Sequence, residues 1–190
     1  SWPAGPGPTP SSFVPTMADL RTYIRDVPGF PKPGIVFKDV MPLLADATAL
    51  RQVVRDLAEF ARPLLPDIVL GAESRGFLFG CPLAYELGAG FAAARKPGKL
   101  PYRTVQATYE LEYGTDSLEL HVDAVRPGTR VLILDDLLAT GGTARAKMDL
   151  VRQLGGDVVG AAFVIELRFL HGRETLAPVP VHSLIEYDSE

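Results

Sequence analysis

Cysteine, net positive charge and long apolar runs are all scarce in this sequence, and each shortage excludes a class of protein. Cys81 is the only cysteine among 190 residues, so an intrachain disulfide is impossible and a reducing compartment, the cytoplasm, is expected. The net charge of −4 argues against a surface that coats nucleic acid. Because no apolar run has the length of a membrane span and no signal peptide is recognisable, no membrane association is expected.

Several chemical motifs are also missing. His121, His171 and His182 lack the spacing of metal ligands and have no cysteine beside them, so no zinc site is expected. The chain has neither the Gly-Lys-Ser/Thr of a Walker A loop nor the Gly-x-Gly-x-x-Gly of a dinucleotide site. Cys81 lies in an apolar helical segment, where a small core residue is predicted rather than a catalytic thiol.

The pattern of apolar residues predicts a single α/β domain with a mostly parallel central sheet flanked by helices. Residues 1–16 are rich in proline and predict a disordered lead-in or a segment added for expression, followed by one domain over 17–190. The expected strands are 68–72, 90–94, 131–134, 157–167 and 181–187, with a hairpin of 105–113 and 117–122. The expected helices are 18–25, 47–62, 77–87 and 143–154.

The stretch 130–146, RVLILDDLLATGGTARA, is the strongest candidate site. A buried strand is predicted to end at Asp135 and Asp136, and small or hydroxyl residues then lead into a helix, which is typical of a backbone cup for phosphate. The carboxylates would repel phosphate, but they could bind ribose hydroxyls or a hydrated Mg²⁺. The alternative is a solvated strand end followed by an ordinary turn.

Two further segments could bind anions. Glu73, Ser74 and Arg75 follow the strand 68–72, so they should lie at the same edge of the sheet as the first loop. Arg95, Lys96, Lys99 and Arg103 form a local basic patch after the strand 90–94. Arg75 could instead be an ordinary surface residue in a turn, and the basic run could be only a solvated face.

Three segments carry a family resemblance: FPKPGIVFKD at 30–39, GAESRGFLFG at 71–80 and VLILDDLLATGGT at 131–143. Together they resemble the adenine phosphoribosyltransferase family of type I phosphoribosyltransferases, over about residues 20–187. The resemblance implies transfer of the phosphoribosyl group of phosphoribosyl pyrophosphate (PRPP) to adenine, giving AMP and pyrophosphate, with Mg²⁺ as cofactor and a homodimer as the assembly. It also implies a small hood over the base at about 27–40 and a hairpin lid at about 101–122.

The same resemblance implies roles for individual residues. Those expected to act in catalysis are Arg75, Glu112, Asp135 and Asp136, the two aspartates also holding the metal through water and ribose hydroxyls. Those expected to bind the 5′-phosphate are Ala139, Thr140, Gly141, Gly142 and Thr143. Those expected to bind pyrophosphate are Glu73, Ser74, Arg75, Arg95, Lys96 and Lys99, with a cis peptide between Glu73 and Ser74 and with Arg95 reaching the site of a neighbouring subunit. Those expected to bind adenine are Phe30, Val36, Lys38 and Leu167.

Some of these positions keep a plainer interpretation. The hood segment could be a rigid surface loop, Leu167 an ordinary core residue and Glu112 a solvated turn residue. Lys38 stands where the family commonly has arginine, so a planar guanidinium is replaced by a point charge. Two other functions are also compatible with the loop: transfer to another purine base, which FPKPGIVF argues against, and a PRPP-sensing regulator, for which no helix-turn-helix segment is available.

Overall fold

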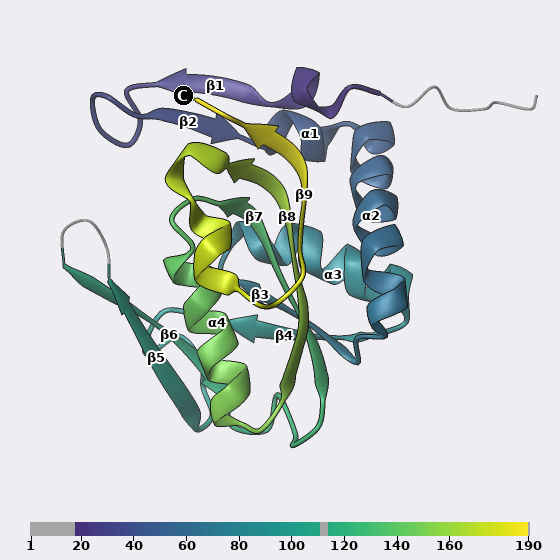
Figure 1. Ribbon diagram of the computed structural model, residues 1–190, viewed down its shortest axis with the longest axis vertical. Helices are drawn as coiled ribbons and strands as arrows, with labels where there is room; N and C mark the ends of the chain where they lie inside the picture. Colours follow the sequence, from purple (N-terminus) through teal and green to yellow (C-terminus); the bar gives the residue numbers. More distant parts are fainter. Residues whose placement is uncertain (1–17, 111–113, 190) are drawn as a thin grey trace, which may run out of the picture.

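A computed structural model describes residues 18–110 and 114–189 and shows one parallel sheet at the centre of the molecule (Figure 1). Its five strands lie in the order β4, β3, β7, β8, β9, and every neighbouring pair is parallel. The bounds are Ile68–Ala72 for β3, Gly90–Ala94 for β4, Arg130–Leu138 for β7, Asp157–Leu167 for β8 and Val181–Tyr187 for β9. The predicted α/β fold with a mostly parallel sheet is confirmed.

Helices cover both faces of this sheet. On one face lie α1 (Met41–Ala45), α2 (Ala47–Ala61) and α3 (Arg75–Leu87). On the other lie α4 (Gly142–Gln153) and an antiparallel hairpin of β5 (Thr104–Glu110) and β6 (Thr115–His121). A second hairpin, β1 (Arg25–Pro28) with β2 (Val36–Asp39), lies beyond the end of the sheet near the C-terminus (Figure 1).

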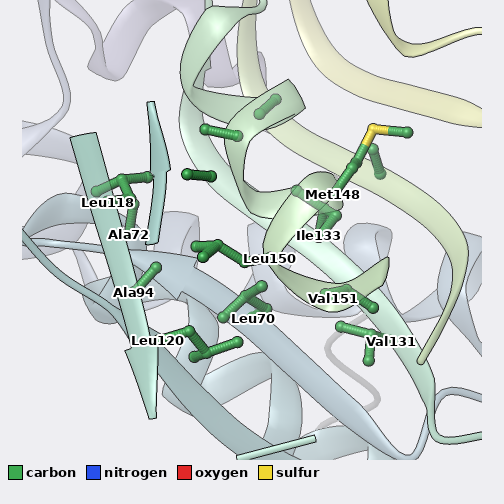
Figure 2. Packing of buried hydrophobic residues seen from close by; sticks show 14 of the residues in the cluster. Leu70, Ala72, Ala94, Leu118, Leu120, Val131, Ile133, Met148, Leu150 and Val151 are labelled. Atoms are coloured by element: carbon green, nitrogen blue, oxygen red, sulfur yellow. The ribbon is translucent and has the colours of Figure 1, made fainter. Parts of the chain in front are cut away.

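Strand β7 shows why the central strands read as unbroken apolar runs. Val131 and Ile133 pack on the face that α4 covers, whereas Leu132 and Leu134 pack on the face that α2 and α3 cover. A strand alternates its side chains between two faces, and here both faces are buried, so polar residues have no place in the run. Figure 2 shows the α4 side of this core.

Four sequence predictions about local structure are wrong. β7 does not end at the two aspartates but continues to Leu138, because β8 still pairs with it there. The helix predicted at 18–25 is only a 3₁₀ turn at Leu20–Tyr23, followed by β1. The plainer interpretation of the hood segment as a rigid surface loop is wrong, since β1 and β2 pair as strands across it. Cys81 is exposed rather than buried, because α3 turns the face containing Phe79 and Leu83 toward the sheet.

Candidate active site

A pocket of about 260 Å³ opens at the carboxyl edge of the sheet, where β3 and β7 end beside the start of α4. Parallel α/β sheets bind their ligands at this edge, because the loops that follow neighbouring strands meet there. Ten of the residues predicted for the site line this one pocket. They are Glu73, Arg75, Lys96, Asp135, Asp136, Ala139, Thr140, Gly141, Gly142 and Thr143.

The loop from Ala139 to Thr143 forms one wall of the pocket. Gly141 has a φ of 89° and precedes the twelve-residue helix α4, whose first turn carries backbone N–H groups without intrahelical partners. A side chain at Gly141 would be strained by this backbone conformation, and its Cβ would come within 2.6 Å of the Gly172 carbonyl oxygen. The loop therefore has the backbone donors and the close backbone approach that a phosphate site needs.

The two carboxylates form the floor of the pocket, and each has its own cation. Asp135 is 8% exposed and accepts a hydrogen bond of 2.6 Å from Lys147 Nζ, which also donates to the Leu134 carbonyl at 2.8 Å. Asp136 is 5% exposed, and its Oδ2 lies 2.8 Å from Arg75 Nε. Each carboxyl group thus has a cationic partner within the chain.

The negative charge of Asp135 also affects the ionisation of Asp136. Burial, followed by the negative charge of Asp135, raises the pKa of Asp136 to about 7, although Arg75 and Lys147 oppose the shift. A carboxyl with this pKa responds strongly to a cation or a hydroxyl placed beside it, because its protonated and ionised forms are nearly balanced at neutral pH.

Lys147 is a site residue that the sequence reasoning missed. Its side chain is fully buried, and it lies on the same face of α4 as the buried residues Ala144, Met148 and Val151. Those four positions have the i, i+3, i+4, i+7 spacing of an apolar helix face, so a lysine among them was the available signal. A lysine is almost never fully buried without a charged partner. Asp135 and Asp136 precede Lys147 by only 12 and 11 positions in the sequence.

The pyrophosphate set divides into residues that line the pocket and residues that support it. The peptide between Glu73 and Ser74 is cis, as expected. Glu73 accepts hydrogen bonds from Arg95 Nε at 3.0 Å and from the backbone N–H of Lys96 at 2.5 Å. Burial alone would raise the pKa of Glu73, but these hydrogen bonds and the charge of Arg95 hold it below its ordinary value. Ser74 and Lys99 are exposed and do not line the pocket.

The β5–β6 hairpin closes a further side of the pocket. Tyr109 and Leu118 line it, and an atom added at Gly142 as a Cβ would lie 3.2 Å from the Tyr109 ring. Lys96 forms an ion pair with Asp116, which also accepts a hydrogen bond of 3.2 Å from the Tyr109 hydroxyl. The alternation of side chains along β5 places Tyr109 on one face with Val105 and Ala107, and this was the signal for its inward position. Glu112 lies outside the described residues.

The residues predicted for adenine do not line this pocket but lie next to it. Phe30 contacts Phe37 edge to face with ring centres 5.2 Å apart, and the Arg75 guanidinium lies 4.9 Å above the Phe37 ring. The hairpin of Phe30 and Val36 is therefore in contact with the anion site through Phe37, a residue that the sequence reasoning did not single out.

The side chain of Lys38 has a structural environment of its own. It is 4% exposed, forms an ion pair of 2.9 Å with Asp26 across the β1–β2 hairpin and lies 4.3 Å from the centre of the Tyr187 ring. Tyr187 pairs in register with Leu167 between β9 and β8. Lys38 thereby joins the hairpin to the sheet edge that contains Leu167, so the four predicted adenine residues lie at one corner of the molecule.

Two observations bear on metals and membranes. Within residues 18–110 and 114–189, no three His, Cys, Asp or Glu side chains are grouped so that they could hold a metal ion. The two aspartates on the pocket floor are therefore a pair of carboxylates, not a complete set of metal ligands.

No helix in the described part of the chain is both long and apolar enough to cross a membrane.

Comparison with known proteins agrees with this geometry. The family model described as "Phosphoribosyl transferase domain" matches residues 44–178. The chain is 54% identical over 169 residues to an adenine phosphoribosyltransferase of Brevibacillus brevis, covering 89% of this chain and 99% of the relative.

Solved structures show the same similarity. The adenine phosphoribosyltransferase of Thermoanaerobacter pseudethanolicus superposes with a TM-score of 0.87 at 52% identity, covering 88% of this chain and 98% of that one. The enzyme of Saccharomyces cerevisiae, solved with adenine and an imino-altritol bisphosphate, superposes with a TM-score of 0.83 at 40% identity, covering 87% and 96%. The chain therefore belongs to the phosphoribosyltransferase family, and within it to the adenine phosphoribosyltransferases.

Proposed function

We propose that this chain transfers the phosphoribosyl group of PRPP to adenine with Mg²⁺ present, giving AMP and pyrophosphate. The observation that carries the proposal is a single pocket that combines a phosphate-type loop, Asp135 and Asp136, and the guanidinium of Arg75. The yeast relative, which has the same fold, was solved with adenine.

Each part of the pocket suits one part of PRPP. The backbone N–H groups of residues 139–143 would hold the 5′-phosphate, and Asp135 and Asp136 would accept hydrogen bonds from the ribose hydroxyls. Arg75 and Lys96 would bind the pyrophosphate. Fixing three points of one substrate turns the encounter with the base into an oriented reaction.

The reaction breaks the bond between C1′ and the pyrophosphate oxygen and forms a bond between C1′ and purine N9. Positive charge develops at C1′ while negative charge grows on the leaving group, so Arg75 and Lys96 stabilise the departing pyrophosphate more than the bound substrate. The N9 proton must leave the base, and Glu112, outside the described residues, is predicted to take part in that transfer.

Asp135 and Asp136 fit Mg²⁺ as an incomplete carboxylate set. This cation usually keeps several waters and binds through one or two carboxylates together with phosphate oxygens of the substrate, so the absence of a three-residue cluster among the described residues is compatible with it. When bound, Mg²⁺ supplies positive charge that neutralises pyrophosphate. The two aspartates would hold its water shell and the ribose hydroxyls.

Adenine recognition is proposed to rest on the backbone of the β1–β2 hairpin. Val36 is paired with Pro28, next to the hydrogen bond from the Gly29 N–H to the Ile35 carbonyl. Hydrogen-bonded and non-hydrogen-bonded pairs alternate along an antiparallel ladder, so the backbone N–H and carbonyl of Val36 point away from the other strand. A backbone carbonyl and a nearby N–H read the amino group and ring nitrogen of adenine, and the same pair would reject an oxopurine, whose donors and acceptors are reversed.

Two finer features stay predictions. Arg95 is predicted to reach the pyrophosphate of a neighbouring subunit in a homodimer, and within this chain it bonds to Glu73. Sedimentation of the unmodified chain at several concentrations tests the dimer, and the pyrophosphate affinity of Arg95→Gln tests the residue. Cytoplasmic location is expected from the scarcity of cysteine alone.

The deciding experiment is an assay of the full chain with PRPP and Mg²⁺, offering adenine, hypoxanthine, guanine and xanthine separately and following nucleotide and pyrophosphate. Turnover of adenine alone supports the proposal. Turnover of an oxopurine would overturn the interpretation of residues 30–39. PRPP binding without turnover of any base would favour a PRPP-sensing regulator.

A further inference from the structure

A short 3₁₀ turn, η4 (Gly172–Leu176), packs directly against the loop proposed to hold the 5′-phosphate. A Cβ built on Gly172 would overlap the Ala139 carbonyl oxygen and lie 3.0 Å from the Gly141 nitrogen. In the opposite direction, a Cβ on Gly141 would overlap the Thr175 hydroxyl. The two backbones are therefore in contact without side chains between them, so a shift of the turn must shift the loop.

The turn is held in place by its last two residues. Leu176 is fully buried in the core on the α4 side of the sheet. Thr175 Oγ1 donates to the Gly172 carbonyl at 2.8 Å, and its own carbonyl accepts from Arg145 Nη1 of α4 at 3.3 Å. These contacts fix the shape of the turn and connect it to α4 and to the core. They do not connect it to the last strands of the sheet.

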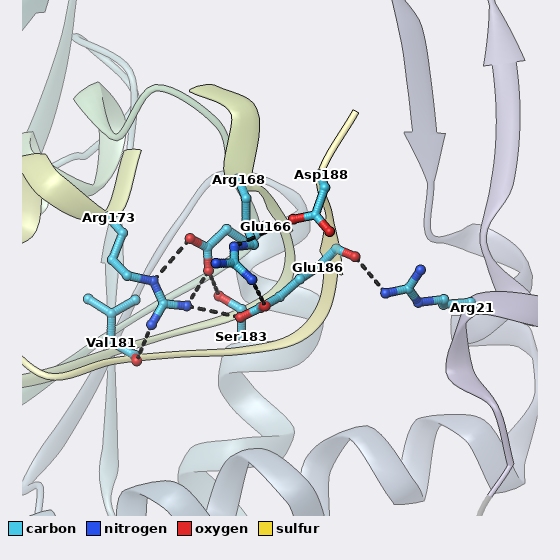
Figure 3. Close-up of polar contacts among 8 residues, drawn as sticks. All are labelled: Arg21, Glu166, Arg168, Arg173, Val181, Ser183, Glu186 and Asp188. Atoms are coloured by element: carbon cyan, nitrogen blue, oxygen red, sulfur yellow. Dashed lines mark hydrogen bonds and ion pairs between the residues drawn. The ribbon is translucent and has the colours of Figure 1, made fainter. Parts of the chain in front are cut away.

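The connection to the sheet is made by Arg173 and a buried carboxylate. Glu166, at the end of β8, is 3% exposed. It accepts hydrogen bonds from both Arg173 Nε, at 3.0 Å, and Arg173 Nη2, and a third from Ser183 Oγ of β9 at 2.6 Å. Arg173 Nη1 donates to the Val181 carbonyl at 3.0 Å. Figure 3 shows the guanidinium between the turn and the two last strands of the sheet.

The ionisation of Glu166 agrees with a permanent ion pair. Burial alone would raise its pKa, but hydrogen bonds from Arg173 and Ser183, together with the charge of Arg173, hold it below its ordinary value. A bidentate guanidinium–carboxylate pair fixes both distance and orientation, which a single flexible contact does not.

We propose that Glu166 and Arg173 are positioning residues for the 5′-phosphate loop, acting through the η4 turn. The inference rests on the proposed function, because it assumes that residues 139–143 hold the 5′-phosphate. Neither residue of the pair lines the pocket. The pair fixes the sheet side of the turn, the turn fixes the backbone of Ala139 and Gly141, and the loop then presents its N–H groups in one arrangement.

The test compares Arg173→Gln with Arg168→Gln. Arg168 is a matched control because it also pairs with Glu186 at the same edge, whereas the hydrogen bonds to Glu166 come from Arg173 and Ser183. Calorimetric affinities for ribose 5-phosphate and for pyrophosphate are measured separately, with KM for PRPP and adenine. The expected result for Arg173→Gln is about a tenfold loss of ribose 5-phosphate affinity and a matching rise in KM for PRPP. Pyrophosphate affinity, KM for adenine and kcat should stay within about twofold.

A second variant addresses the contact itself and covers the case in which Arg173→Gln does not fold. Gly172→Ala would push the Ala139 carbonyl away. The control Gly90→Ala meets its nearest atoms only at 3.6 Å, an ordinary contact. Gly172→Ala should lose ribose 5-phosphate affinity selectively, and Gly90→Ala should not.

The outcomes separate the two proposals. If the unmodified chain binds no ribose 5-phosphate and turns over no adenine, the proposed function fails, and this inference fails with it. If the unmodified chain binds and reacts but a folded Arg173→Gln and Gly172→Ala keep full ribose 5-phosphate affinity, only the inference is overturned. Equal losses for ribose 5-phosphate and pyrophosphate would also overturn it, since a general loosening of the fold affects both.

Discussion

Asp135 and Asp136 are neighbours in the chain but belong to two different regions of the molecule. Asp135 is bound to Lys147 of α4, whose side chain is fully buried. Asp136 is bound to Arg75, whose side chain is 36% exposed and lies over the Phe37 ring of the β1–β2 hairpin. One half of the pocket is therefore part of the core, whereas the other half is assembled at the surface from separate segments.

The two halves of the pocket suit different groups of the substrates. The buried half consists of one continuous stretch, from the end of β7 through the loop into α4, and its charges are balanced inside the protein. The exposed half brings together α3, the basic segment after β4 and two hairpins. A fixed half suits the group that stays bound through the reaction, the ribose 5-phosphate, and an adaptable half suits the base and pyrophosphate, which must enter and leave.

The largest effect should come from removing the buried cation. Lys147→Met would leave Asp135 buried without a counter-charge and should lower the free energy of unfolding by roughly 3–5 kcal/mol. Urea unfolding measures this. Adding Asp135→Asn should restore most of the loss, because no unpaired charge then remains. The control Arg152→Met removes an exposed i,i+3 pair with Asp149 on the same helix and should cost at most about 0.5 kcal/mol. Equal losses of unfolding free energy in Lys147→Met and its control would contradict the idea that this half of the pocket is part of the core.

The next effect is on catalysis rather than stability. Asp136→Asn should keep the fold, because burial already disfavours the ionised carboxylate, but should lower kcat by about 100-fold or more through loss of a charge near the reacting ribose. Steady-state kinetics with Mg²⁺ and both substrates measures this. Asp149→Asn, on the exposed face of α4, is the control. A folded Asp136→Asn with an unaltered rate would remove this carboxylate from the mechanism.

The raised pKa of Asp136 predicts a pH dependence of stability in the ligand-free protein. Between its ordinary value of 3.8 and about 7, the folded chain retains a proton that the unfolded chain has released. Stability contributed by this group should therefore fall as the pH rises through that window, by at most about 1.4 kcal/mol per pH unit. In urea unfolding, the free energy of unfolding of the unmodified chain should fall relative to that of Asp136→Asn as the pH rises from 4 to 7. A constant difference would place the carboxyl in an ordinary environment.

The smallest effect concerns the exposed half of the pocket. Arg75→Lys keeps the positive charge but loses the planar group that lies over Phe37 and pairs with Asp136. KM for PRPP should rise by about tenfold, whereas the free energy of unfolding should change by less than about 0.5 kcal/mol, because the side chain is partly exposed. Arg62→Lys, in a surface pair with Glu86, is the control. A large loss of stability in Arg75→Lys would show that the two halves are not distinct.

Much of the buried half was predictable because it is local. The apolar run of β7, the two carboxylates and the small residues before α4 are consecutive, so their order alone indicates a strand, a loop and a helix at one sheet edge. The end of the strand was predicted wrongly, since two aspartates look like a solvated terminus. In the structure their charges are paired by Lys147 and Arg75, and the strand continues.

The exposed half was predicted less completely for a physical reason. Hairpin β1–β2 depends on cross-strand pairing and on contacts with Tyr187 and Arg75, which are distant in sequence. Propensity does not encode such contacts, and prolines in the connection disguised the strands. The exposed position of Cys81 was missed for the same reason, because which face of an apolar helix is buried depends on its neighbours.

The sequence by itself determined the α/β class, the sheet strands and the order of strand, loop and helix in residues 130–146, because these follow from the order and periodicity of adjacent residues. Only the tertiary structure decided which cation balances each aspartate, that Tyr109 and Phe37 border the site and that the η4 turn packs against the loop. Those features are contacts between residues far apart in the chain, and they exist only once the elements have packed.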